Sequence, residues 1–405
     1  MSGRRRTAKS LANDAVVRRA VVDEIAASGV DRVGPTAVAR RAGFTTGAVY
    51  GRYENTAEMV VDAWLEEVWP RFSALLDAVV AVVVDGADPG PGGVDAVVAD
   101  LVDPPPWLLA GTEMLAVAHR HEELGEVVIP QMAHRLDAWA AGTGAPPRRR
   151  ADVLLATGAV IGMGLHDLAG LPSGADEPVL AWYRRAVATD AEAPAPLPPM
   201  AMTDVAIDTG DPVSDLLLAA SIEVIADVGF ERATTSRIAR RAGLGTNWIY
   251  AEHDSKQELL LAAVEAVVSV LDPGATVGDL TIGRSVATPL GAAGLALAAI
   301  LEPHRRTASR VRLEAFLCAR HYPPGVEQLS GLQSELIGRY VDAARLGDPM
   351  LAEVGRPVVL FLAAEVVGLP VLDSLVGPLT DVDWRQGLLP LEQVAIEVWR
   401  QQVSG

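Results

Sequence analysis

The apolar positions of residues 213–228 recur with the spacing of a helix that is buried along one side. The apolar stripe consists of Leu218, Ile222, Ile225 and Ala226. This pattern predicts an amphipathic α-helix. Gly229 follows directly and marks the predicted end of the helix, because glycine readily takes the backbone conformation that terminates helices.

Two shorter helices are predicted after this first one. Within "ERATTSRIARRAG", Thr234 suits the N-cap of a helix that runs to Ala242, and Gly243 suits the turn that follows. A third helix is predicted over "TNWIYAEH", and a fourth begins near Ser255, where "SKQE" fits a capping box. Two short helices joined by a glycine-containing turn and braced by a longer helix form a helix-turn-helix arrangement.

The same pattern occurs earlier in the chain. The pentapeptide "ARRAG" stands at residues 39–43 and again at residues 239–243. Residues 16–65 align with residues 216–265 without a gap, and both glycines and apolar positions keep this register. A register preserved over the whole span indicates a duplication, because chance repetition of a short motif would not preserve it.

The similarity between the two copies continues further along the chain. The segments "LLAGTEMLAVAHRH" and "SRVRLEAFLCARHY" align through Glu113 with Glu314 and Ala118 with Ala319. The segments that follow the helix-turn-helix patterns are therefore also predicted to be copies of each other.

A proline-rich segment separates the two copies. Pro194, Pro196, Pro198 and Pro199 lie within a short stretch that cannot be helical, and we interpret it as an extended linker. The predicted domains are a first helix-turn-helix domain at residues 10–60, a first helical domain at 61–188, the linker at 189–211, a second helix-turn-helix domain at 212–260 and a second helical domain at 261–405.

Both copies resemble the TetR family of transcriptional regulators. In the second copy the resemblance rests on Gly229, Phe230, Ala233, Thr234, Ile238, Ala239, Ala242, Gly243, Tyr250, Ser255, Lys256 and Leu259. In the first copy it rests on Gly29, Val38, Ala39, Ala42, Gly43, Thr45, Gly47, Tyr50, Tyr53 and Met59. The second copy departs from the family pattern at Gly245, where Ser or Thr is usual, and at Trp248, where Thr is usual.

The resemblance implies an all-α fold with two tandem TetR-like units. Each unit would have an N-terminal helix-turn-helix domain of three helices and a helical domain for ligand binding and dimerisation. In the family the last two helices form the dimer interface, and the matching stretches here are residues 150–188 and 352–402. We therefore expect an intrachain pseudo-dimer.

The start of each recognition helix is expected to read base edges in the major groove of double-stranded DNA. The residues at these positions are Thr45, Thr46, Gly47, Ala48 and Arg52 in the first copy and Thr246, Asn247 and Trp248 in the second. By resemblance, the phosphate contacts would come from Tyr50, Tyr250 and Lys256, with Thr36 and Ser236 assisting. Arg40, Arg41 and Arg240 are further candidates for DNA contact. The alternative is that the two tyrosines are core aromatics and the arginines a solvated face.

The resemblance also implies a pocket for a small-molecule effector in each helical domain. The candidate lining residues are Trp107, Met114, Met132, Trp139, Met163 and His166 in the first domain, and Arg312, Phe316, Cys318, Phe361 and Glu365 in the second. The alternative is that these are core positions, with Glu365 and Arg312 forming a buried pair. His119 and His121 lack a third metal ligand, so we expect them to be surface residues.

Charge is distributed unevenly between the two copies. The formal net charge of −18 argues against nucleic acid as a partner, but residues 1–60 hold ten Lys and Arg against six Asp and Glu. Residues 213–266 hold five against eight. The first copy is therefore expected to be the stronger electrostatic binder. The arginines near the N-terminus, Arg4 to Arg6, could contact DNA or form a solvated tail.

Composition favours a cytoplasmic protein without cofactor or metal. Cys318 is the single cysteine, which excludes an intramolecular disulfide and a zinc thiolate site. The N-terminal "MSGRRRTAKS" lacks the apolar core of a signal peptide, and apolar runs such as "LLDAVVAVVVDG" are interrupted short of membrane-spanning length. We expect no membrane partner.

The sequence shows no catalytic motif, so we do not expect an enzyme. It predicts a ligand-responsive transcriptional regulator, a repressor, that reads a non-palindromic operator with two unequal heads. The alternative is a small-molecule-binding or protein-interaction module that has lost DNA affinity in one or both heads.

Overall fold

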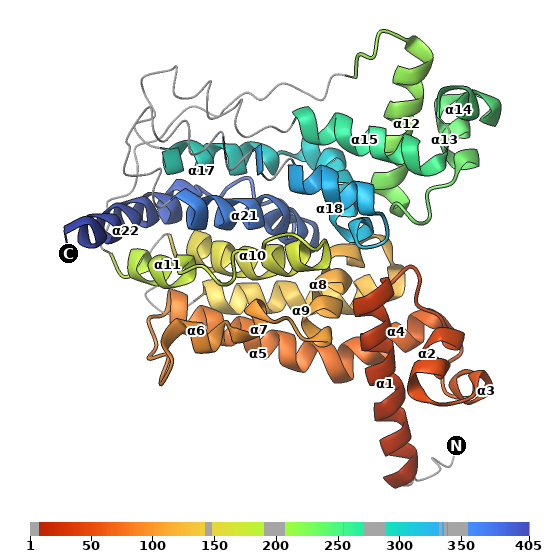
Figure 1. The fold of residues 1–405 in the computed structure, drawn as a ribbon. Helices are drawn as coiled ribbons and strands as arrows, with labels where there is room; N and C mark the ends of the chain where they lie inside the picture. The colour runs from red at the N-terminus through yellow and green to blue at the C-terminus, as the bar shows by residue number, and fades with distance from the viewer. Residues whose placement is uncertain are drawn as a thin grey trace.

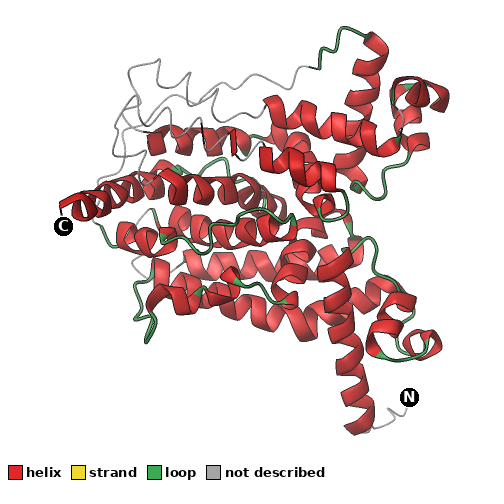
Figure 2. Cartoon of the chain, viewed as in Figure 1, coloured by secondary structure: helices red, strands yellow, loops and turns green. Residues whose placement is uncertain are grey.

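The computed structural model of the chain describes residues 8–141, 148–189, 207–253, 255–270, 289–331, 334–335, 338 and 355–404. Every regular element in these residues is a helix (Figures 1 and 2), so the predicted all-α class is confirmed. The arginines near the N-terminus and most of the proline-rich linker lie outside the described residues.

The first half of the chain, residues 8–189, begins with three helices that we call the first head. These are α1 (Ala8–Ser28), α2 (Pro35–Ala42) and α3 (Thr46–Tyr50). A nearly continuous helical run follows, made of α4 (Thr56–Ala63), the π-helical η1 (Trp64–Val68), α5 (Trp69–Val79) and the π-helical η2 (Val80–Val84). The remaining elements are α6 (Gly93–Val97), α7 (Ala99–Val102), α8 (Pro106–Val117), the 3-10 helix η3 (Ala118–Arg120), α9 (Glu122–Ala140), α10 (Arg149–Leu168) and α11 (Val179–Val187).

The second half, residues 207–404, also begins with three helices, which we call the second head. These are α12 (Pro212–Val228), α13 (Thr235–Ala242) and α14 (Thr246–Glu252). The elements that follow are α15 (Lys256–Val270), α17 (Pro289–Ile300), the 3-10 helix η4 (Pro303–Arg305), α18 (Arg306–Ala319), α21 (Gly355–Val376) and α22 (Arg385–Ser404).

The helices of the two halves pack into one helical core, and both heads project from the same side of it (Figure 1). Helix α10 of the first half packs along α21 of the second, and α11 packs along α22. The approach of α10 to α21 is so close that a Cβ atom on Gly162 would overlap the carbonyl oxygen of Ala364. Each head rests on its own half in the same way, because α1 packs on α8 and α12 packs on α18.

Two helices are long and apolar enough to cross a membrane, which corrects the expectation that apolar runs stop short of that length. They are α10 and the part of α21 from Arg356 to Val376. In the most apolar window of each helix, 94% and 72% of the residues are buried inside the protein. The high hydropathy of both helices is therefore accounted for by their place in the helical core.

Candidate nucleic-acid interface

Each head contains two short helices joined by a turn in which glycine is required. Gly43 ends α2 with φ of 70°, and Gly243 ends α13 with φ of 71°. This left-handed conformation is strained for residues that carry a Cβ atom. After the turn come α3 and α14, which occupy the position of the recognition helix in a helix-turn-helix arrangement.

The caps of the second head agree with the sequence prediction. The Thr234 side chain accepts a hydrogen bond from the Arg237 N–H and caps α13. The Ser255 hydroxyl accepts from the Glu258 N–H at the start of α15, at 3.1 Å. These polar side chains satisfy N–H groups that have no partner within their own helix.

The two recognition helices begin differently. In the first head the Thr45 hydroxyl accepts a hydrogen bond from the Ala48 N–H at 3.3 Å and caps α3. In the second head Gly245 occupies the cap position of α14 and offers no side chain to do so. Because α14 lacks this cap, its first turn is held less firmly than that of α3.

The outer faces of α3 and α14 carry large exposed aromatic side chains. Tyr50 is 60% exposed, Tyr250 is 61% exposed and Trp248 is 43% exposed, whereas Val49 and Ile249 are buried against the rest of their heads. Neither tyrosine is therefore a core aromatic. A tyrosine that is open to solvent at the end of a recognition helix can donate its hydroxyl proton to a phosphate.

The other candidates on these helices also face solvent to different degrees. Thr36, Thr45, Gly47, Ser236, Thr246 and Asn247 are exposed, and Thr46 and Ala48 are half-buried. Asn247 has an amide that can form two hydrogen bonds with an adenine edge. Its counterpart in the first head is Gly47, which has no side chain. The polar surfaces of the two recognition helices therefore differ.

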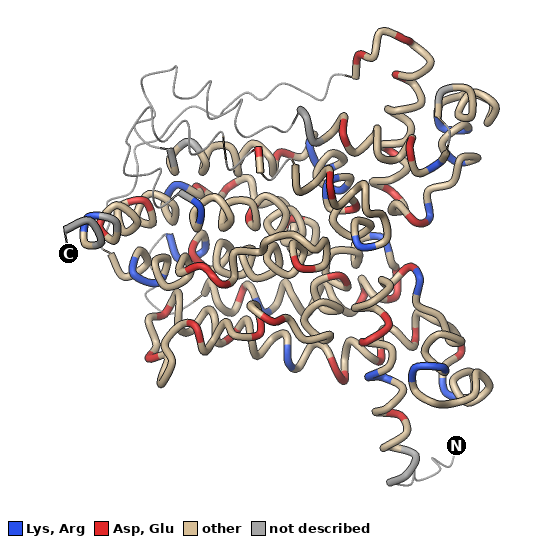
Figure 3. Tube along the Cα trace, viewed as in Figure 1, with Lys and Arg blue, Asp and Glu red and all other residues tan. Residues whose placement is uncertain are grey.

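The arginines of α2 and α13 fall into two kinds, and Figure 3 shows them beside the recognition helices. Arg40 and Arg240 are exposed and make no ion pair within the described residues. Arg41 pairs with Glu24 at 2.9 Å. Arg40 and Arg240 are therefore free to bind a phosphate, whereas the charge of Arg41 is already partly neutralised by Glu24.

Two cations in the second half also make contacts next to the recognition helix. Arg241 pairs with both Glu223, at 2.5 Å, and Asp227, at 3.1 Å. The Lys256 ammonium donates to the Glu231 carbonyl oxygen at 3.3 Å and lies 5.9 Å from the centre of the Phe230 ring. The two ion pairs reduce the charge that Arg241 can present to DNA, as the pair with Glu24 does for Arg41.

Arg52 acts within the first head as a brace. Its Nε donates to Asp14 at 2.8 Å, another of its nitrogens donates to the Ala48 carbonyl oxygen, and its guanidinium lies over the Phe44 ring. The side chain therefore ties α1 to α3. A role in orienting the recognition helix follows from this position.

The first set of candidate pocket residues is dispersed through the core of the first half. Met114, Met132 and Met163 are fully buried. Trp107 packs edge-on against a phenylalanine, and the Trp139 Nε1 donates to a carboxylate at 2.9 Å. These residues pack in the manner expected of core positions.

The second set is buried as well, and the ion pair between Glu365 and Arg312 that the alternative interpretation required does not form. Glu365 is 0% exposed, and neither of its oxygens has a hydrogen-bond partner in the described part of the chain. Burial raises the pKa of Glu365 well above its usual value. Burial, followed by nearby Arg305, lowers the pKa of Arg312 to about 10. The two groups lie against different neighbours, because Glu365 faces Gly158 of α10, where an added Cβ atom would lie 2.5 Å from its carboxylate, whereas Arg312 lies near Arg305.

The remaining residues of the second set also lie in the packed interior. Phe361 is 0% exposed, Phe316 stacks on His166 with ring centres 5.2 Å apart, and Cys318 is buried. Burial raises the pKa of the Cys318 thiol to about 12, so this thiol is unreactive near neutral pH.

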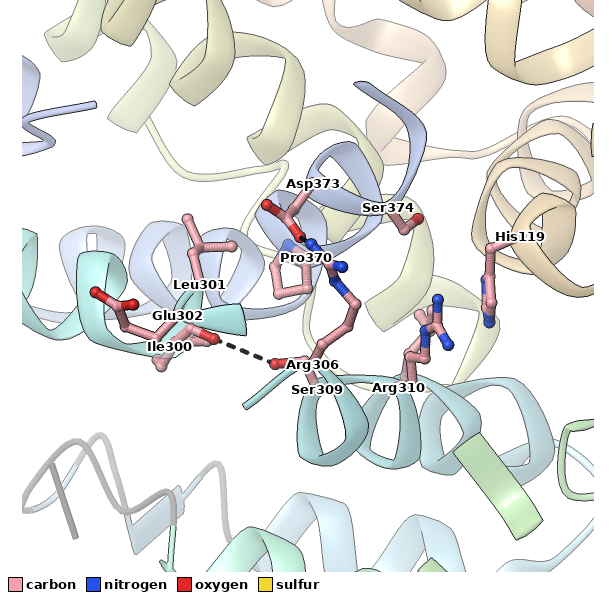
Figure 4. Close-up of a pocket in the computed structure, with 11 residues that line it drawn as sticks. His119, Ile300, Leu301, Glu302, Arg306, Ser309, Arg310, Pro370, Asp373 and Ser374 are labelled. Atoms are coloured by element: carbon pink, nitrogen blue, oxygen red, sulfur yellow. Dashed lines mark hydrogen bonds and ion pairs between the residues drawn. The ribbon is translucent and has the colours of Figure 1, made fainter. Parts of the chain in front are cut away.

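A small cavity of about 20 Å³, with room for about one water molecule, lies elsewhere, between α17, α18 and α21, with His119 from the first half at its edge (Figure 4). Its walls include Arg306, Ser309, Arg310 and Asp373. The Arg306 guanidinium pairs with Asp373 at 3.1 Å. Sequence analysis did not identify this cavity, since its lining comes from three helices and from both halves of the chain.

Three nitrogen atoms in the lining of this cavity are buried without a hydrogen-bond partner in the described residues. They are Nε2 of His119 and the Nε atoms of Arg306 and Arg310. Burial, and then Arg310, lowers the pKa of His119 to about 3, so its ring is neutral near pH 7. His119 is half-buried and the His121 side chain is 21% exposed, so neither is the open surface residue that was expected. The neutral His119 ring donates its Nδ1–H to the Ala116 carbonyl oxygen, 3.0 Å away, so its Nε2 is an acceptor, whereas the Nε–H groups of Arg306 and Arg310 are donors that suit an acceptor oxygen.

No cluster of three or more potential metal ligands occurs among the residues that the structure describes. His121 instead contacts Asp31, with its Nε2 at 3.1 Å from a carboxylate oxygen.

Comparison with known proteins identifies one of the two heads. Residues 217–263 match the family model of bacterial regulatory proteins of the tetR family. The match begins within α12 and ends within α15, so it includes the whole helix-turn-helix of the second head. No curated protein matches the chain. The match supports a DNA-binding transcriptional regulator of the TetR family.

Proposed function

We propose that this protein is a ligand-responsive repressor of the cytoplasm that reads a non-palindromic DNA operator with two unequal heads. The observation that carries the proposal is the recurrence of one helix-turn-helix geometry in both halves, with one copy matched by the TetR family model. Exposed Tyr50 and Tyr250 lie on recognition helices that face the same side of the molecule (Figure 1).

The proposed reading heads correspond to residues 10–60 and 212–260, and the proposed helical domains to residues 61–188 and 261–405. The repeated packing of α1 on α8 and of α12 on α18 supports two tandem units. The packing of α10 on α21 and of α11 on α22 supports their pairing as an intrachain pseudo-dimer. Because both heads belong to one chain, their recognition helices need not be identical.

The proposed contacts divide into phosphate contacts and base contacts. Arg40, Arg240, Tyr50 and Tyr250 would bind phosphates, because their polar groups are exposed beside the recognition helices. Asn247 would contact an adenine edge in the second half-site. Since the first head has a glycine at the matching position, the two half-sites would differ in sequence.

The proposed effector site is the region around the cavity between α17, α18 and α21, whose walls would have to separate to admit a small molecule, because the cavity itself has room for about one water. The buried Nε–H groups of Arg306 and Arg310 favour a small molecule that carries a carboxylate or another oxygen acceptor, and Nε2 of His119 would accept a hydrogen bond from it. Repression follows as the expected sign of regulation, with the effector releasing the protein from DNA.

A second function is favoured by the charge of the second head. The pairing of Arg241 with Glu223 and Asp227 supports a ligand-binding or protein-interaction module in which this head has lost DNA affinity. Under that alternative only the first head, or neither head, would bind DNA.

The test is a protection footprint of the purified protein on DNA that flanks its own gene, at low salt and without effector. The proposal expects unequal protection of two successive major grooves. The matched control is the Arg40→Ala and Arg240→Ala double variant, which should protect the same DNA only at much higher concentration. Protection of a single groove would show that the second head does not read DNA, and absence of protection would favour the module.

A further inference from the structure

Each head is attached to its own half by one buried carboxylate. Helix α1 ends before Gly29, and the next N–H, that of Val30, donates to the Glu113 carboxylate at 2.7 Å. Helix α12 ends before Gly229, and the N–H of Phe230 donates to the Glu314 carboxylate at 2.9 Å. Glu113 lies in α8 and Glu314 in α18, so the same connection occurs in both halves.

The partner of each carboxylate comes from the opposite half. Arg120, in the first half, donates to Glu314 at 3.0 Å. Arg320, in the second half, donates to Glu113. We call these two side chains the crossover arginines. Each half therefore supplies the cation that neutralises the carboxylate beneath the other half's head.

The crossover arginines also contact the backbone at the end of the first helix of the opposite head. Arg320 donates to the carbonyl oxygen of Ala26 at 3.0 Å, and Arg120 donates to that of Val228 at 3.4 Å. Carbonyl groups at the end of a helix lack partners within the helix and carry partial negative charge, so a cation binds there favourably. Each guanidinium thus joins the opposite head to its own half.

The contacts leave little room for movement. A Cβ atom added to Gly229 would lie 2.5 Å from the guanidinium carbon of Arg120, and one added to Gly29 would lie 2.8 Å from a nitrogen of Arg320. The side chains of Arg120 and Arg320 are 3% and 12% exposed. A head that tilted away would leave a buried charge without its partners, which is strongly unfavourable.

Further contacts join the two sides of this region. Arg120 also donates to Asp31 at 2.7 Å, and the His321 Nε2 lies 3.0 Å from the Ser28 carbonyl oxygen. Arg32 of the first head pairs directly with Glu231 of the second at 2.5 Å. The region beneath the two heads is therefore one continuous set of polar contacts.

We propose that Arg120 and Arg320 are positioning residues that hold the two heads at a fixed separation and tilt. They would thereby set the spacing between the two half-sites that the chain accepts. The inference rests on the proposed function, because it assumes that both heads read DNA. The spacing preference would then be set by two side chains that do not contact DNA.

The first experiment selects DNA from a library in which two fixed half-sites are separated by spacers of variable length. The full-length protein is compared with its Arg120→Met and Arg320→Met double variant, which keeps the side-chain length and loses the charge. The parent should prefer a narrow range of spacers. In the variant the preference for the favoured spacers over neighbouring ones should fall about tenfold, while the affinity for a single half-site should stay the same.

The second experiment measures head positions without DNA. Spin labels are placed at Glu54→Cys and Ala251→Cys, two exposed positions of which the first follows α3 and the second lies in α14, with the buried native thiol removed by Cys318→Ala. The distance distribution between the labels should be narrow in the parent and clearly broader in the double variant. An Arg120→Lys and Arg320→Lys variant, which keeps the charge, should recover most of the narrow distribution.

The matched control is Arg356→Met. Arg356 pairs with Glu177 of the other half at 3.0 Å, but it is 62% exposed and belongs to the start of α21 rather than to the head junctions. Its loss should change neither the spacing preference nor the distance distribution. The proposal would be wrong if a folded Arg120→Met and Arg320→Met variant also left the spacing preference and the distance distribution unchanged. If the parent selects no DNA, the proposed function fails, and the distance distribution alone decides whether these arginines position the heads.

Discussion

Gly162 of α10 lies directly against the carbonyl oxygen of Ala364 in α21, so that the two helix backbones touch. The contact is reciprocal along the helices, because a Cβ atom on Gly368 would overlap the carbonyl oxygen of Gly158. Backbone contact of this kind requires residues without side chains at the crossing point.

We expect Gly162→Val to weaken the packing of α10 on α21, because the added side chain has no space. The free energy of unfolding should fall by about 3 kcal/mol, measured by urea denaturation. Gly331→Ala is the control, since a Cβ atom there meets nothing within 4 Å. Equal stability of the two variants would contradict the close approach of the helices.

The buried ring of His166 should make stability depend on pH. Burial lowers the pKa of His166 from 6.5 to about 4, so the unfolded chain takes up a proton between these values and the folded chain does not. Stability from this group is therefore present at pH 7 and is lost as the pH falls, by about 2 kcal/mol at pH 5.

The measurement compares the wild type with His166→Phe at pH 7 and pH 5. Carboxylates with raised pKa values act in the opposite direction, and Asp152 and Asp167 are among them, with pKa values of about 6 and about 7. For this reason the difference between the two proteins is the relevant quantity, because it cancels their contribution. A difference that stays constant from pH 7 to pH 5 would show that His166 takes up its proton as readily in the folded protein as in the unfolded chain, and would contradict the lowered pKa.

Arg40 and Arg41 should contribute unequally to DNA binding although they are adjacent. Arg40 is exposed and makes no ion pair in the described residues, whereas Arg41 is paired with Glu24. Arg40→Ala should lower affinity for all sequences and reduce the slope of log affinity against log salt by about one. Arg41→Ala should leave this slope nearly unchanged, and the opposite order would contradict the assignment.

Asn247 should determine base preference in the second half-site alone. Asn247→Ala should lose about 1–3 kcal/mol of discrimination at one base pair, measured by competition with single-base variants of the operator. The matched substitution in the first head is Gly47→Ala, for which a Cβ atom meets nothing within 4 Å. It should leave the second half-site's preference intact. If Asn247→Ala removed the base preference in both half-sites, the two heads would not recognise DNA independently.

Local structure was predictable from the sequence because its determinants are neighbours in the chain. Thr234 caps α13, and Gly43 and Gly243 form the turns, as their chemistry requires. The candidate pocket residues were less predictable. Whether Arg312 and Glu365 form a pair depends on which way α18 and α21 are turned about their axes, and the spacing of residues in the sequence does not determine this.

The polar contacts that cross between the halves beneath the heads could not be predicted from the sequence. Alignment of Glu113 with Glu314 indicated that the two carboxylates are equivalent, but nothing in the sequence joins Arg120 to a residue 194 positions away. The exchange of partners depends on how the two halves face each other. The same reason explains why the cavity beside His119 went unrecognised.

The joining of α10 and α21 within one chain also has a consequence for dilution. Two separate subunits dissociate as their concentration falls, whereas the two halves here remain at the same high local concentration however few molecules are present. Even at a few molecules per cell, every molecule would carry both heads. Occupancy of DNA would then rise in simple proportion to copy number, without the threshold that assembly of a dimer imposes.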